Sequence, residues 1–229
     1  MEKISVTLTH KEKMLGWIYY PLQLLIIPLV ISLVNALIGY PMNEAVLNFV
    51  YFAVNFVCIL LIGFRFLKNN AKNALKAPLR CISSAVIGLF FYWGLSYIIQ
   101  IFIMIIDPTF FNVNDASIDN MIQENSTLMT VGIVLLVPIA EEFLYRGLFF
   151  SQFYNRKPIA AYLISTCIFA AIHVVGYAFD YPMLRLVLCF LQYLPAGIAM
   201  GWAYARADSI WASILMHTAI NLIGALAMR

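Results

Sequence analysis

Charged side chains are scarce in this sequence. Asp, Glu, Lys and Arg make up 11% of its 229 residues, whereas 63% of the residues are hydrophobic. An ordinary soluble domain has about 25% charged residues. The deficit excludes a separate soluble domain, so we expect a single integral membrane domain over residues 1–229. The net charge of +3 is too small to indicate binding to nucleic acid.

Cysteine pairs and a cleavable signal are also missing. The four cysteines have no C-x-x-C spacing and lie in or beside apolar runs, which favours free thiols packed as small hydrophobic side chains. The first apolar run, residues 17–38, is too long for a signal-peptide core, and no small-residue cleavage site follows it. We therefore expect this run to be retained as a membrane span.

Long apolar runs, in contrast, are frequent. About 20 apolar residues cross the hydrocarbon core as a helix. Runs of this length predict an all-α polytopic membrane helix bundle with about seven transmembrane helices. The predicted spans are residues 17–38, 46–67, 82–106, 128–149, 158–178, 184–205 and 209–227. Residues 107–127 predict a polar loop with a short surface helix.

Lysine and arginine are almost absent from every second connection. They precede the first span and join spans two and three, four and five, and six and seven, leaving only Arg185 and Arg229 on the other side. The other connections carry acidic residues: Glu44, Asp107, Asp115, Asp119, Glu124 and Asp180. The positive-inside rule therefore places the N-terminus in the cytoplasm and the C-terminus outside.

A few strongly polar residues nevertheless lie inside the spans. Ionisable groups at bilayer depth are costly and mark functional sites. The candidate site residues are Glu141, Glu142, Arg146, His173, His217 and Asn221.

Helix geometry divides these residues. Glu142 and Arg146 are four apart and predict an ion pair on one helical face. Glu141 points about 100° away from Glu142, which leaves it free for chemistry. Pro138 removes a backbone hydrogen bond and predicts a kink that widens a cavity. His217 is predicted to lie at a shallower depth than Glu141, unless the 206–209 loop dips inward or the fourth and fifth segments extend past the membrane.

Two kinds of chemistry fit these residue types. A carboxylate beside a neutral imidazole polarises water for attack on a carbonyl, while a second histidine and an asparagine donate to the oxyanion. A glutamate with two histidines also makes a reasonable zinc site. The spacing does not distinguish the two.

Three motifs resemble those of the CPBP family of intramembrane proteases, which includes the CAAX prenyl-protein endopeptidases and the bacterial Abi proteins. They are Glu141-Glu142-Phe-Leu-Tyr-Arg146, Phe169-Ala-Ala-Ile-His173 and His217-Thr-Ala-Ile-Asn221. The resemblance covers residues 125–225, which we expect to form the protease core. The compact chain resembles bacterial members, which implies a bacterial cell membrane.

The resemblance implies a CAAX-type intramembrane endopeptidase that hydrolyses a peptide bond of a peptide or lipidated protein substrate. Its conical cavity would open toward the cytoplasm. Glu141 and His173 would activate water, and His217 and Asn221 would stabilise the oxyanion.

In this resemblance, Glu142 and Arg146 would support the arrangement of the catalytic groups. The family is described both as metalloproteases and as glutamate-dependent enzymes. We favour the glutamate mechanism without a metal, with zinc as the alternative cofactor.

Two other functions compete with the protease. One is a non-catalytic membrane scaffold or bacteriocin-immunity protein that binds a partner through its helices. The other is a small transporter, which the lack of internal repeats disfavours. Expected partners are the peptide or lipidated protein substrate and membrane lipids.

Overall fold

The computed structural model describes residues 3–39 and 41–228, and within these ranges it contains helices and no strand. Seven helical stretches of this part of the chain are long and apolar enough to cross a membrane, which confirms the predicted all-α bundle. The protein is therefore an integral membrane protein. Arg229, one of the two basic residues predicted on the acidic side, lies outside the described residues.

Two of the seven stretches, the first and the fourth, contain changes of helix type. The first is α1 (His10–Pro21), the π-helical η1 (Leu22–Ile26) and α2 (Ile27–Ile38); the second and third are α3 (Glu44–Lys76) and α4 (Pro78–Ile106). The fourth is α6 (Ser126–Val131), η2 (Gly132–Leu136), α7 (Val137–Glu142), η3 (Phe143–Phe150) and α8 (Ser151–Tyr154). The last three are α9 (Pro158–Val175), α10 (Met183–Ala207) and α11 (Ile210–Ala227), and α5 (Val113–Glu124) precedes the fourth.

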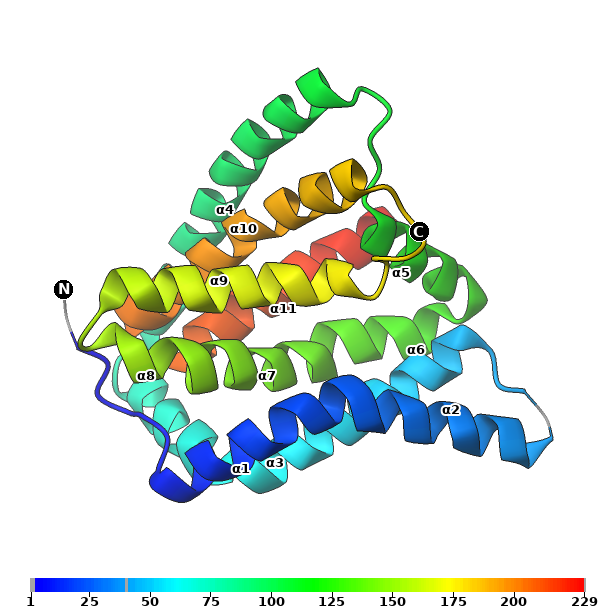
Figure 1. Cartoon of the computed structure of the whole chain (residues 1–229). Coiled ribbons are helices and arrows are strands. Elements are labelled where there is room, and N and C mark those ends of the chain that lie inside the picture. The colour runs from blue at the N-terminus through cyan, green and yellow to red at the C-terminus, as the bar shows by residue number, and fades with distance from the viewer. Residues whose placement is uncertain (1–2, 40, 229) are drawn as a thin grey trace.

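The fourth stretch forms the centre of the bundle (Figure 1). Half of its most apolar window is buried, against 6% for the first and third stretches. It packs against α3, α9 and α11, and α10 closes the bundle by packing on α4, α9 and α11. The stretch that carries the two adjacent glutamates is thus the one best shielded from lipid.

The connections rich in lysine and arginine gather at one end of the bundle, which we term the basic end. The Asn155 side chain accepts a hydrogen bond from the Ile4 backbone and donates one back to it, both at 2.9 Å. Asp208 accepts from the Ser5 backbone at 2.7 Å and from the Asn73 side chain. These contacts join the connections at Asn155 and Asp208, the end of α3 and the N-terminal segment.

The opposite, acidic end carries the loops with the acidic residues and is spread apart. Figure 1 shows α4 diverging from α10 there, and α2 buries none of its residues. The predicted surface helix of the 107–127 loop is present as α5, and it lies at this end. The molecule is therefore closed at its basic end and open at its acidic end.

Candidate active site

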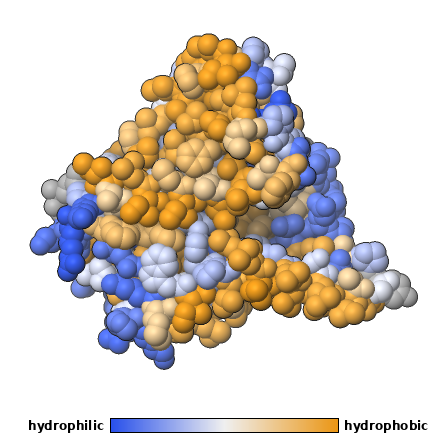
Figure 2. Space-filling view, viewed as in Figure 1, coloured by the Kyte–Doolittle hydropathy of each residue, from blue (hydrophilic) through white to orange (hydrophobic). Residues whose placement is uncertain are grey.

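A cavity of about 850 Å³ extends from the middle of the bundle to the acidic end. Glu141 and His217 line its inner part, and Glu44, Asp115 and Tyr177 line its outer part. Figure 2 shows the molecule hollowed there, with hydrophilic residues beside the hollow.

The direction of this cavity makes two sequence expectations incompatible. The charge distribution places the acidic end outside, whereas the family resemblance implies a cavity that opens to the cytoplasm. Because the cavity opens at the acidic end, only one of the two can hold.

Pro138 shapes the wall of the cavity. It has no N–H group, and its ring crowds the preceding turn, so the chain widens into the π-helical η2 just before it. The missing donor frees backbone carbonyls one turn earlier. Thr218 donates to the Val134 carbonyl at 3.1 Å, and Asn221 donates to the Ile133 carbonyl at 2.7 Å. The proline thereby ties the fourth span to α11.

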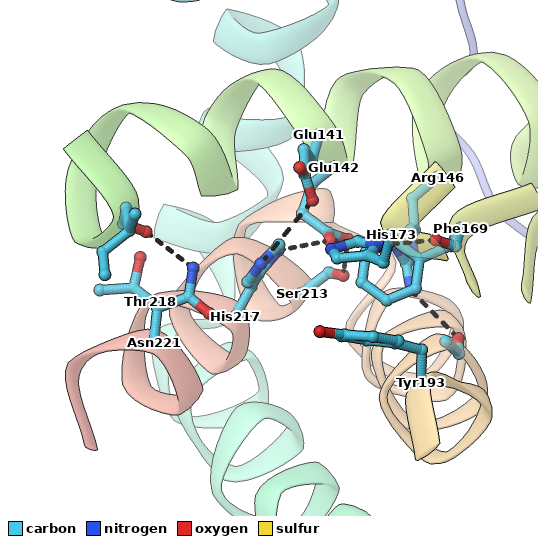
Figure 3. Close-up of polar contacts among 12 residues, drawn as sticks. Glu141, Glu142, Arg146, Phe169, His173, Tyr193, Ser213, His217, Thr218 and Asn221 are labelled. Carbon is cyan, nitrogen blue, oxygen red and sulfur yellow. Dashed lines mark hydrogen bonds and ion pairs between the residues drawn. The ribbon is translucent and has the colours of Figure 1, made fainter. Parts of the chain in front are cut away.

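Glu142 is fully buried and holds three partners (Figure 3). Its Oε1 accepts from Arg146 Nη1 at 3.0 Å and lies 2.9 Å from His217 Nδ1. Its Oε2 accepts from the Ser213 hydroxyl. The predicted Glu142–Arg146 ion pair is confirmed, and its carboxylate also holds two residues of α11.

Arg146 is equally buried and extends this network to two more helices. Its Nη2 donates to the Gly197 carbonyl at 3.2 Å, and its guanidinium lies 4.6 Å from the Phe169 ring centre. Gly197 also lets α10 lie close to α9, because a Cβ there would lie 3.0 Å from the Thr166 Cα. Gly197 therefore serves helix packing.

Glu141 points away from this network and lines the cavity, with a quarter of its side chain exposed. Its Oε2 lies 4.0 Å from His217 Nε2 and has no hydrogen-bond partner among the described residues. Since Glu142 can only accept at His217 Nδ1, that nitrogen carries the proton and Nε2 faces Glu141. The two adjacent glutamates thus bracket one imidazole.

His173 occupies the other wall of the cavity. Its Nδ1 lies 2.7 Å from the Phe169 carbonyl, which can only accept, so Nδ1 is the donor and Nε2 stays free. The described residues show no hydrogen bond or ion pair between His173 and Glu141. The structure therefore brings Glu141 closest to His217, with His173 facing the same cavity.

The turn that leads into α11, and so to His217, is buried. Ser209 donates to the Asn70 carbonyl at 2.8 Å, and Asn70 Oδ1 accepts from the Ile210 backbone at 3.0 Å. Both Ser209 and Asn70 are fully buried. The turn that leads into α11 is thus packed inside the protein, and both explanations considered for the depth of His217 stay predictions.

The zinc alternative finds no matching geometry. Among residues 3–39 and 41–228, no three His, Cys, Asp or Glu side chains are grouped closely enough to hold a metal ion together. The side chains as arranged do not fit a zinc site, so the reaction proposed for this cavity does not include a zinc ion. The metal-independent mechanism stays a prediction.

Two site residues were not found from the sequence. Ser213 lies four residues before His217 on one helical face, and this spacing was a usable signal. Tyr193, whose ring stacks on that of His173 at 4.3 Å between ring centres, gave no signal because aromatic residues are common in membrane spans.

Comparisons with known proteins agree with the three motifs. Three proteins of Lactococcus lactis subsp. lactis (strain IL1403) are similar to this chain. UPF0177 protein YxdF is 25% identical over 76% of this chain and 91% of its own length. UPF0177 protein YaiF is 29% identical over 73% of this chain and 72% of its own length. UPF0177 protein YbdJ is 31% identical over 41% of this chain and 36% of its own length.

No solved structure matches the chain. Residues 123–223 match the model of the family described as type II CAAX prenyl endopeptidase Rce1-like. This segment contains all six candidate site residues. The family resemblance inferred from the three motifs is therefore confirmed over residues 123–223, the part of this chain that matches the Rce1-like family model.

Proposed function

We propose that this protein is an intramembrane endopeptidase that hydrolyses a peptide bond inside the cavity. The observation that carries the proposal is the Glu141 carboxylate. It faces the cavity beside two imidazoles that each present Nε2, and its Oε2 has no hydrogen-bond partner among the described residues. A carboxylate in this setting can take a proton from water.

The reaction follows from these groups. Water held between Glu141 and His173 Nε2 attacks the carbonyl carbon while Glu141 takes its proton. The second N–H of Asn221 donates to the oxyanion, and Nε2 of His217 donates as well when this ring carries a second proton besides the one on Nδ1. Glu141 then gives its proton to the leaving amine, which completes the hydrolysis.

In this proposal, Glu142 and Arg146 do not touch the substrate. Both are fully buried and do not line the cavity, so they hold His217 in place. A scaffold protein would explain this buried network, but not a carboxylate oxygen at a cavity wall that has no hydrogen-bond partner among the described residues. The substrate is a peptide or a lipidated protein, and because the similar proteins are bacterial we place the chain in a bacterial cell membrane.

The test is peptide mass spectrometry of a mixed peptide and lipopeptide pool incubated with purified protein in lipid. We expect products with the wild type and none with Glu141→Ala. Glu44→Ala is the matched control, since Glu44 lines the same cavity far from the imidazoles and its loss should leave cleavage intact. Cleavage by a folded Glu141→Ala protein would refute the mechanism. Addition of a chelator to the wild type tests the metal requirement.

A further inference from the structure

The first turn of α5 is bound to the cavity wall although this helix lies outside the spans. Asn112 caps the helix by accepting from the Asn114 and Asp115 backbone, and its Nδ2 donates to Gln192 Oε1 at 2.7 Å. Asn114 Nδ2 donates to the Tyr193 hydroxyl at 2.9 Å, and that hydroxyl donates to Asp115 Oδ1 at 2.9 Å. The polar tip of Tyr193 is thus satisfied by α5.

The aromatic face of Tyr193 contacts the candidate site. Its ring lies 4.3 Å from the His173 ring, centre to centre, at an angle of 26° (Figure 3). Phe169 contacts the same imidazole at 4.6 Å and also accepts its Nδ1–H through the backbone carbonyl. The His173 ring is therefore confined by two aromatic rings and one hydrogen bond, which fixes where Nε2 points.

Asp115 completes this chain of contacts from α5. It lines the cavity together with Tyr193 and His173. Burial raises the pKa of the Asp115 carboxyl, while the hydrogen bond from Tyr193 acts in the opposite direction. The carboxyl is thus kept out of water with the Tyr193 hydroxyl as its donor.

We propose that Tyr193 and Asp115 are positioning residues that hold the His173 ring in its orientation, so that a helix outside the membrane spans completes the hydrolytic site. This inference rests on the proposed function, since it concerns the same water-activating imidazole. Tyr193 acts by stacking and Asp115 acts by holding Tyr193. Neither needs to touch the substrate.

Four variants separate the parts of this arrangement. Tyr193→Leu removes the ring, Tyr193→Phe removes only the hydroxyl, Asp115→Ala removes the acceptor, and Asp115→Asn keeps one. We expect Tyr193→Leu to lower kcat at least about tenfold with KM nearly unchanged, because binding is intact while the imidazole is misplaced. Tyr162→Phe, in an aromatic cluster away from the cavity, is the control and should keep wild-type kcat.

The hydrogen bond is tested by a double-mutant cycle. Tyr193→Phe and Asp115→Ala should each lower kcat by about fivefold, the size of one hydrogen bond. The double variant should be no slower than Tyr193→Phe, because loss of the hydroxyl already removes the contact with Asp115. Asp115→Asn should restore kcat to near the wild-type rate. Additive losses, or no loss with Tyr193→Leu, would overturn the inference.

A second readout does not depend on catalysis. The chain has only three histidines, so NMR of ring-labelled histidine in nanodiscs gives three imidazole signals, assigned with His10→Gln and His173→Gln. Stacking on Tyr193 should shift the His173 ring protons upfield. Tyr193→Leu should abolish this shift and Tyr193→Phe should retain it. An unchanged His173 signal in Tyr193→Leu overturns the inference, whereas cleavage that survives Glu141→Ala overturns the proposed function.

Discussion

Replacing Arg146 with methionine should destabilise the protein far more than replacing any exposed charge. Arg146 Nη1 donates to Glu142 at 3.0 Å, Nη2 donates to Gly197, and the guanidinium lies over Phe169. Without it, Glu142 remains fully buried and keeps Ser213 and His217 as its partners among the described residues.

The expected cost follows from the burial of both charges. Breaking a buried ion pair by removing one partner costs about 3–5 kcal/mol, because an uncompensated charge stays in the interior. For a chain of this size such a loss lowers Tm by about 10 °C. Glu142→Gln should cost a similar amount, since it leaves Arg146 unpaired.

The double variant Glu142→Gln, Arg146→Met should recover much of this loss. It leaves no buried charge and roughly preserves side-chain volume. We expect it to be destabilised by about 3 kcal/mol less than the sum of the single variants, which is the coupling of the pair. This result would show that the pair stabilises the site as a unit.

The assay can use the protein's own buried thiols. Cys81 and Cys189 are buried and become accessible to a thiol-reactive dye on unfolding, after the exposed Cys167 is replaced with alanine. Arg156→Met, at an exposed position of the basic end, is the control and should leave Tm unchanged. The reasoning is refuted if the loss of stability in the double variant equals the sum of the losses in the two single variants.

Two further predictions concern packing and orientation. Gly63→Ala should cost about 1–3 kcal/mol in the same unfolding assay, because its Cβ would lie 2.0 Å from the Phe143 ring. Gly94→Ala meets no atom within 4 Å and should be neutral or stabilising. If the charge rule governs orientation, an impermeant maleimide should label Asn120→Cys in intact cells and Arg156→Cys only after permeabilisation, in a cysteine-free background. The reverse labelling pattern would mean that the cavity opens toward the cytoplasm.

The spans could be predicted because apolar length is a local property. The predicted run at residues 82–106 differs from α4 only by an extension to Pro78, and the run at 209–227 differs from α11 by one residue at its start. The Glu142–Arg146 pair could be predicted for the same reason, since four residues along a helix fix a shared face.

What the sequence left open depends on contacts between distant segments. The turn before α11 is held by Asn70, 139 residues before Ser209 in the chain. The orientation of His173 depends on Tyr193, which is held in turn by Asp115 on a helix outside the spans. No periodicity within one segment encodes such pairings, because each requires knowing which helices are neighbours.

The two adjacent glutamates show how far local geometry can reach. A step of about 100° per residue was enough to predict that they point to different surroundings. In the structure, Glu142 is enclosed by Arg146, Ser213 and His217, while Glu141 Oε2 has no hydrogen-bond partner among the described residues. Glu141 is therefore the carboxylate that can change its protonation state without breaking the network. Substitution at 142 should reduce stability first, whereas substitution at 141 should abolish cleavage in a protein that still folds.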